Sequence, residues 1–214
     1  MSLLAKEPEN ERILISEGVH LAVCIGVWDL GTQHNKIFDR EIHQVLIMWE
    51  IPDERITVDN KDLPLAISKR YTLSLNEKAN LRKDLEAWRG KAFPAETLKE
   101  GFDLKKILGK TCQIQIIHNE NNGKTYANIA GIMALPKGTK SLESENPLKF
   151  YSMADSKEIP TDTPGWIKDI IKQSKEFRTE ETNEEDIVEE AGIEDINKVF
   201  EEEGITELTK GRKK

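Results

Sequence analysis

Two stretches of the chain combine aromatic rings with cationic side chains at strand spacing. Residues 40–51 (REIHQVLIMWEI) and residues 66–75 (AISKRYTLSL) each alternate with a two-residue period. A single nucleic-acid strand is held by cations that neutralise phosphates and by rings on which bases stack, at about 1–3 kcal/mol per stacked base. The residues of this type are Arg40 and Trp49 on the first stretch and Lys69, Arg70 and Tyr71 on the second.

The segments beside these strands carry further residues of the same kinds. Lys36 and Phe38 precede the first stretch, and Lys124 and Tyr126 flank a later hairpin. We expect these loops to border a binding groove that is floored by the two strands. The hypothesis requires Trp49 and Tyr71 to face solvent, although every second residue of a barrel strand faces inward. For the same reason only one of Lys69 and Arg70 can serve the groove.

The elements that would position these residues follow a recognisable order. Two-residue periodicity predicts five strands, and helical spacing of apolar residues predicts two helices between the third and fourth strands. The predicted strands are 20–30, 40–51, 66–75, 110–118 and 126–133, and the predicted helices are 79–88 and 103–108. This order is that of the five-stranded oligonucleotide-binding (OB-fold) barrel. The predicted fold class is therefore mainly β with added helices: a closed OB-fold barrel with a helical insertion between strands 3 and 4, a C-terminal helix and an acidic tail.

Particular residues set the expected element ends. Pro52 is expected to end the second strand, because proline cannot donate to the sheet. Ser74 or Asn76 is expected to cap the first helix, and Gly90 to end it. Asn122 and Gly123 supply the positive φ angles that a two-residue hairpin turn requires.

Charge is distributed unevenly along the chain. The net charge is −8, but residues 1–140 carry 20 Lys and Arg against 19 Asp and Glu, whereas residues 141–214 carry 11 against 20. The objection that an acidic protein repels phosphates therefore applies to the C-terminal part alone. The predicted organisation is an N-terminal extension (1–17), an OB-fold domain (18–140), a linker with an amphipathic helix (141–178) and an acidic, flexible tail (179–214).

Catalytic, metal and cofactor motifs are missing from the sequence. The four histidines have no ligand spacing, and Cys24 and Cys112 lie in β-branched apolar runs typical of a core. Asp29, Asp39 and Glu41 resemble a two-metal carboxylate set, but 39 acidic residues make such clusters expected by chance. We expect no enzyme activity, no cofactor and no metal. Because no membrane span or targeting segment is evident either, the expected location is the cytoplasm.

Three segments resemble a known group of proteins. They are VCIGVWDLGTQ (23–33), LKKILGKTCQIQIIHNENNGKTYANIAGIMALPKG (104–138) and PGWIKDIIKQSKEF (164–177). The chain is similar over roughly residues 18–177 to bacteriophage and prophage OB-fold single-stranded DNA-binding proteins of the replication and recombination module. The resemblance implies that the protein coats single-stranded DNA in the host cytoplasm. It also implies a phage recombinase, annealing protein or helicase as a partner of the C-terminal region.

One feature departs from that group, and one alternative function remains open. The acidic stretch ends in GRKK rather than in acidic residues followed by a hydrophobic one, which weakens recruitment of a partner through the extreme C-terminus. The alternative is an OB-fold protein-interaction module, a phage structural or assembly adaptor, whose working surface is the helix at Trp166 and the acidic tail. Open barrel edges and that helix also offer surfaces for a homodimer. The preference between DNA and RNA is left open.

Overall fold

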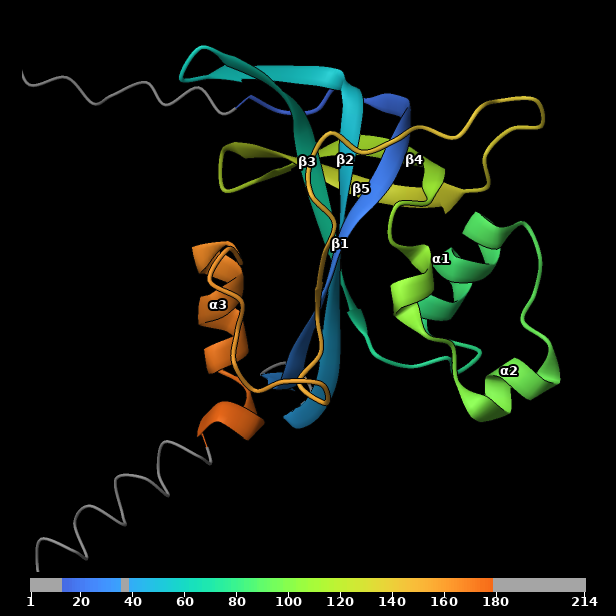
Figure 1. Ribbon diagram of the computed structural model, residues 1–214, viewed down its shortest axis with the longest axis vertical. Helices are drawn as coiled ribbons and strands as arrows, with labels where there is room; N and C mark the ends of the chain where they lie inside the picture. Colours follow the sequence, from blue (N-terminus) through green and yellow to red (C-terminus); the bar gives the residue numbers. More distant parts are fainter. Residues whose placement is uncertain (1–12, 36–38, 179–214) are drawn as a thin grey trace, which may run out of the picture.

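A computed structural model describes residues 13–35 and 39–178 of the 214-residue chain. These residues form one sheet flanked by short helices (Figure 1). The strands are β1 (Gly18–Asn35), β2 (Arg40–Val58), β3 (Lys61–Thr72), β4 (Thr111–Asn121), β5 (Lys124–Met133) and β6 (Lys149–Tyr151). The helices are α1 (Asn80–Arg89), α2 (Ala95–Glu100), the 3-10 helix η1 (Leu104–Ile107) and α3 (Gly165–Lys172).

The sheet is built around β1, whose partner on one edge changes along its length. The order is β3-β2-β1-β4-β5 with antiparallel pairing, and β6 adds to β1 in parallel. Residues 18–23 of β1 pair with β4, and residues 26–28 pair with β6. The β1–β2 register shifts between Cys24 and Gly26 and again between Asp29 and Gly31. Such bulges bend and twist a strand, which lets β1 serve two neighbours on one edge.

Both faces of β1 and β2 are buried, each by a different apolar cluster. One face, with Cys24, Val45 and Trp49, forms the main core against α1, whose Leu81, Leu85 and Trp88 point inward at helical spacing. The opposite face carries Trp28, Leu30 and Leu46, which pack against Tyr151 and against Ile167 and Ile171 of α3. Figure 1 shows α3 on one side of the long strands and α1 with α2 on the other.

A buried carboxylate fixes the chain that leads to β6. Glu50 on β2 is fully buried. Its carboxylate accepts hydrogen bonds from the backbone N–H groups of Glu145 and Asn146, at 2.7 and 3.0 Å, and from Asn146 Nδ2 at 2.8 Å. A buried ion without such partners is strongly unfavourable, so these bonds hold residues 145–146 against the sheet. Arg55 adds a salt bridge to Glu145 at 2.6 Å.

The sheet is not closed, so the predicted barrel is not shown. Within the described residues β3 pairs only with β2, and β5 pairs only with β4. The N-terminal strap lies between these two edges: Ile13–Ile15 border a groove with Leu65–Ile67 of β3 and with Tyr126 of β5. Ile15 is buried in the main core. The coarser prediction, a mainly antiparallel β-fold with a few helices, is confirmed.

Several local predictions are confirmed. Gly90 ends α1 in the left-handed conformation, and Asn122 and Gly123 both have positive φ in a two-residue hairpin turn. Cys24 and Cys112 are free and fully buried, and burial raises the pKa of the Cys24 thiol to about 12.

Two predictions of element ends are wrong. Strand β2 does not end at Pro52 but continues to Val58. The β2–β3 register shifts between Ile51 and Arg55, so Pro52, which has no backbone N–H, does not have to donate a hydrogen bond to β3. The N-cap of α1 is Ala79, with no side-chain cap, rather than Ser74 or Asn76.

None of the helices in the described part of the chain is long and apolar enough to cross a membrane.

Gly31 is where the C-terminal segment approaches β1 most closely. Its φ is +67°, and an added Cβ would lie 2.6 Å from Ser174 Cβ and 2.7 Å from Met153 Cε. Gly123 has a similar φ of +70°, but an added Cβ there would meet nothing within 4 Å. The two glycines therefore share backbone strain and differ in packing.

We predict that Gly31→Ala lowers the free energy of unfolding by at least about 3 kcal/mol, from left-handed strain and overpacking together. Gly123→Ala should cost about 1–2 kcal/mol from strain alone. Urea unfolding of both variants measures the difference. Equal losses would contradict tight docking of the C-terminal segment on Gly31.

Candidate nucleic-acid interface

The aromatic residues of the predicted groove do not face solvent. Trp49 is fully buried, and its ring lies 5.9 Å from that of Trp88. Tyr71 is 4 % exposed, and its hydroxyl donates to Asp84 Oδ2 at 2.8 Å. Burial and the Asp84 carboxylate raise the pKa of the Tyr71 phenol. The expectation that these two rings form a solvent-facing platform is therefore wrong, because both lie on the inward-facing set of strand positions.

The cations at the same strands do gather at one place. A pocket of about 670 Å³, here called the cationic groove, lies between the start of β2, the end of β3 and the start of α1. Its lining brings together three of the predicted residues, Arg40, Arg70 and Tyr71. The remaining lining residues are Gln44, Thr72, Ser74, Asn76, Lys78, Ala79 and Asn80. Three of the described lining residues are cationic and none is acidic, so the groove attracts anions.

Two of the three cationic side chains, Arg70 and Lys78, are available to bind a ligand. In the described part of the chain, the side chains of Arg70 and Lys78 have no hydrogen-bond or ion-pair partner. Lys69 differs, because its Nζ lies 2.8 Å from Asp84 Oδ2 and 5.3 Å from the Tyr71 ring centre. Successive side chains of β3 point to opposite faces of the sheet, so the two adjacent cations are separated. Arg70 pairs with Leu46 on the face that carries α3, here called the outer face, and Lys69 points to the other face, where it contacts Asp84 of α1.

Two further features of the lining favour an anionic ligand. Helix α1 begins in the groove without a side-chain cap and without an acidic residue in its first turn. Its first N–H groups lack intrahelical acceptors and carry the positive end of the helix dipole. Gln44 Oε1 is buried with no hydrogen-bond partner among the described residues. Buried polar atoms are rarely left unpaired in the absence of a ligand or water.

The remaining predicted residues lie elsewhere. Lys124 and Tyr126 belong to β5 beside the β4–β5 hairpin, whereas Arg40 is the first residue of β2, beside the β1–β2 hairpin. Figure 1 shows that the β1–β2 hairpin lies at the far end of the long strands from β4 and β5. Tyr126 lines the groove between β3 and β5. Lys36 and Phe38 lie outside the described residues. The nine candidates therefore do not form one continuous surface.

Sequence reasoning missed most of the residues that line the cationic groove. Thr72, Ser74, Asn76, Lys78 and Asn80 come from the end of β3, the following loop and the first residue of α1. The missed signal was the absence of any acidic residue in the first turn of the helix, where Asp and Glu are normally favoured.

The outer face beside the cationic groove is covered by the protein's own C-terminal segment. Several polar contacts hold that segment to the β1–β2 end, and we call four of them the latch. They are Met153 N–H to Asp29 Oδ2 (3.3 Å), Gln33 Nε2 to the Ile170 carbonyl (2.9 Å), Thr32 Oγ1 to Glu176 Oε1 (2.7 Å) and Lys175 Nζ to Glu41 Oε2 (2.7 Å). On this side the open surface therefore lies mainly on β3 and at the beginning of α1.

The stability of the latch depends on the protonation of His43, which is bonded to the latch residue Asp29. Its Nε2 lies 2.7 Å from Asp29 Oδ1, and this hydrogen bond raises the pKa of His43 against the opposing effect of burial. Burial opposes ionisation of Asp29, but the hydrogen bonds from His43 and the Gly31 N–H outweigh it and lower the Asp29 pKa. Hydrogen bonds from Thr32 likewise outweigh burial and lower the pKa of Glu176.

The structure separates the carboxylates that resemble a two-metal set. Asp29 is bonded to His43, Glu41 to Lys175, and Asp39 lies 3.5 Å from His34. The described residues contain no group of three or more side chains placed to hold a metal ion.

Comparison with known proteins adds no assignment. No protein-family model matches the chain, and no curated protein sequence is significantly similar to it. The geometry of the groove therefore carries the functional argument.

The latch should be strongest between about pH 4.5 and 6.5. The raised pKa of His43 stabilises the fold fully below its unfolded value of 6.5, and this stabilisation is lost as the pH rises through the folded pKa. The lowered pKa values of Asp29 and Glu176 stabilise the fold above 3.8 and 4.5, respectively, and this contribution is lost as the pH falls through their folded values.

Urea unfolding across pH 4–9 tests this window. His43→Gln should remove the decline in stability on the alkaline side, and His34→Gln, at an exposed pair, should leave it in place. An unchanged profile in His43→Gln would exclude the coupling.

Proposed function

We propose that the protein binds single-stranded nucleic acid, with DNA as the first candidate, through phosphate contacts in the cationic groove. The observation that carries the proposal is the convergence of Arg40, Arg70 and Lys78 in a pocket without a described carboxylate. Lysine and arginine bind phosphates by displacing condensed counterions, and this contribution is independent of base sequence. The proposed role is to coat or protect exposed strands without sequence preference.

The fold is consistent with an open form of the oligonucleotide-binding barrel. The strand order β3-β2-β1-β4-β5, with α1 between β3 and β4, is that of such a barrel before closure between β3 and β5. The groove lies on strands 2 and 3, where barrels of this kind take their ligands. Membership of the phage single-strand-binding group, and a recombinase, annealing protein or helicase as partner, belong to the same proposal.

The burial of Trp49 and Tyr71 changes the expected physics of binding. Without base stacking on these rings, affinity depends mainly on charge and is correspondingly sensitive to salt. Quenching of tryptophan fluorescence is then a poor readout, because Trp28, Trp49 and Trp88 are buried and only Trp166 is substantially exposed. Fluorescence anisotropy of a labelled oligothymidine of about 30 nucleotides avoids this dependence.

The protein-interaction module is the competing function. Its supporting observation is Trp166 on α3, which is 46 % exposed although Ile167 and Ile171 of the same helix are buried. If the labelled oligonucleotide does not bind at low salt, the strand-binding proposal fails and the interaction module is favoured.

We predict that Arg70→Ala with Lys78→Ala weakens oligothymidine binding about tenfold or more at low salt. Because two phosphate contacts are lost, the slope of log affinity against log salt should become shallower by about 1.4. Anisotropy titrations at several salt concentrations measure both quantities.

The matched control changes Lys91 and Lys99, two exposed lysines outside the cationic groove, to alanine. Both double variants remove two positive charges from the net charge. Equal weakening in the two would mean that overall charge, rather than the groove, determines binding.

A further prediction concerns residues 179–214, which carry 13 acidic and 5 basic residues. If this segment competes with phosphates for the groove, a chain ending at Arg178 binds oligothymidine more tightly at low salt. The gain should disappear at high salt, where charges are screened. Unchanged or weaker binding by the shortened chain would refute the competition.

A further inference from the structure

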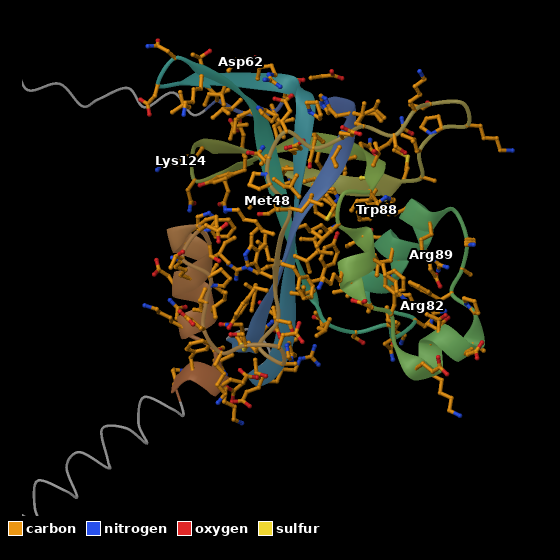
Figure 2. All side chains as sticks on the ribbon, viewed as in Figure 1. Met48, Asp62, Arg82, Trp88, Arg89 and Lys124 are labelled. Atoms are coloured by element: carbon orange, nitrogen blue, oxygen red, sulfur yellow. The ribbon has the colours of Figure 1, made fainter. Side chains whose placement is uncertain are left out.

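A second cavity lies at the other end of α1. Its volume is about 490 Å³, and it is open to solvent between the C-terminal turn of α1, η1, the start of β4 and the chain that follows β5. Its lining includes Trp88 and Arg89 from α1, Phe102, Lys106 from η1, and Lys110. Figure 2 shows Trp88 and Arg89 on α1, well apart from Lys124 on the hairpin. Its lining shares no residue with the cationic groove.

The lining of this cavity is positively charged. Arg89, Lys106 and Lys110 contribute three cations, and no Asp or Glu belongs to the described lining. Lys106 and Lys110 have no side-chain hydrogen bond or ion pair with any described residue. Glu86 is close enough for the Arg89 charge to help lower its pKa, but its carboxylate is already bonded to Arg82 and to the Phe93 N–H.

The guanidinium of Arg89 has a hydrogen-bond donor without an acceptor among the described residues. Its guanidinium stacks 4.2 Å from the Phe93 ring centre and lies 5.9 Å from that of Phe102. Its Nη1 is buried and has no hydrogen-bond partner among the described residues. Arginine stays charged at all relevant pH values, so a buried N–H without an acceptor is costly. Arg89 also lines the cavity, so an anionic ligand there would lie beside a guanidinium that lacks this acceptor.

The aromatic part of the lining favours a ligand that contains a planar ring. Trp88 is buried in the main core, and its indole N–H donates to the Thr111 carbonyl at 3.1 Å, so its ring forms the base of the cavity rather than an open surface. Phe102 is half-buried and contributes the aromatic surface that a ligand can reach. A simple anion would use only the cations, whereas a planar ring that carries a phosphate would use both parts of the lining. The volume lies in the range of small-molecule sites.

We propose that this cavity binds a nucleoside phosphate, with the phosphate held by Arg89, Lys106 and Lys110 and the base against Phe102. The ligand is a free nucleotide or the phosphorylated end of a strand, which present the same chemistry. The site is separate from the cationic groove, and its existence does not depend on strand binding there.

Isothermal titration of the full-length protein with deoxyadenosine monophosphate tests the proposal, with deoxyadenosine and inorganic phosphate as comparison ligands. The nucleotide should bind at least about tenfold more tightly than either, because only it uses both parts of the lining. No binding of the nucleotide at millimolar concentration, or equal binding of inorganic phosphate, would overturn the proposal.

Charge reversal at exposed lysines locates the site without disturbing the core. Lys106→Glu with Lys110→Glu should weaken nucleotide binding about tenfold or more, whereas Arg70→Glu with Lys78→Glu in the cationic groove should not. The second pair should instead abolish oligothymidine binding, so failure of one site is distinguishable from failure of the other. Equal effects of the two pairs on the nucleotide would refute a separate site.

A competition experiment distinguishes a free nucleotide from the phosphorylated end of a strand as the natural ligand. If a strand end is the natural ligand, a 5′-phosphorylated oligonucleotide displaces the nucleotide and its unphosphorylated counterpart does not. If a free nucleotide is the ligand, neither oligonucleotide displaces it. Both results support the proposed site. Arg89→Lys, which keeps the charge but loses the planar fork, should weaken binding in either case.

Discussion

The requirement to bury both faces of β1 and β2 determines the rest of the structure. A strand that is apolar on both sides needs two layers of cover, and this protein supplies them from different parts of its chain. Helix α1 covers one face. Residues 149–178 cover the other, and β6 completes the edge of β1 where β4 no longer pairs with it. The C-terminal segment is therefore part of the packed body of the fold.

This packing also decides where a ligand can reach the sheet. The second layer covers the outer face of β1 and part of β2, and the latch at Asp29 and Glu176 holds it there. What stays open is the outer side of β3 and the beginning of α1. Cations that cannot be buried without partners remain at that rim, so charge gathers at the boundary of the covered area.

The two ends of α1 then act in different ways. At its start the uncapped N–H groups and the dipole add to the positive field of the cationic groove. At its end Arg89 complements the negative end of the dipole while it also stacks on Phe93. The bonds from Tyr71 and Lys69 to Asp84 tie α1 to β3. The positions of both cavities therefore depend on the same helix.

The sequence by itself determined the periodic elements, because two-residue and helical spacing of apolar side chains reflect burial directly. It predicted five of the six strands, the helices at 79–88 and 103–108 that correspond to α1 and η1, and the turn at Asn122 and Gly123. It also selected Arg40 and Arg70, which meet in one groove. Alternation fixes that neighbouring residues face opposite sides but not which side is the core, so the orientation of Trp49 and Tyr71 was decided only by the position of α1. Short β6 and the cover formed by α3 were likewise decided by tertiary contacts, because a three-residue strand and a single apolar helix carry no sequence signal for their partners.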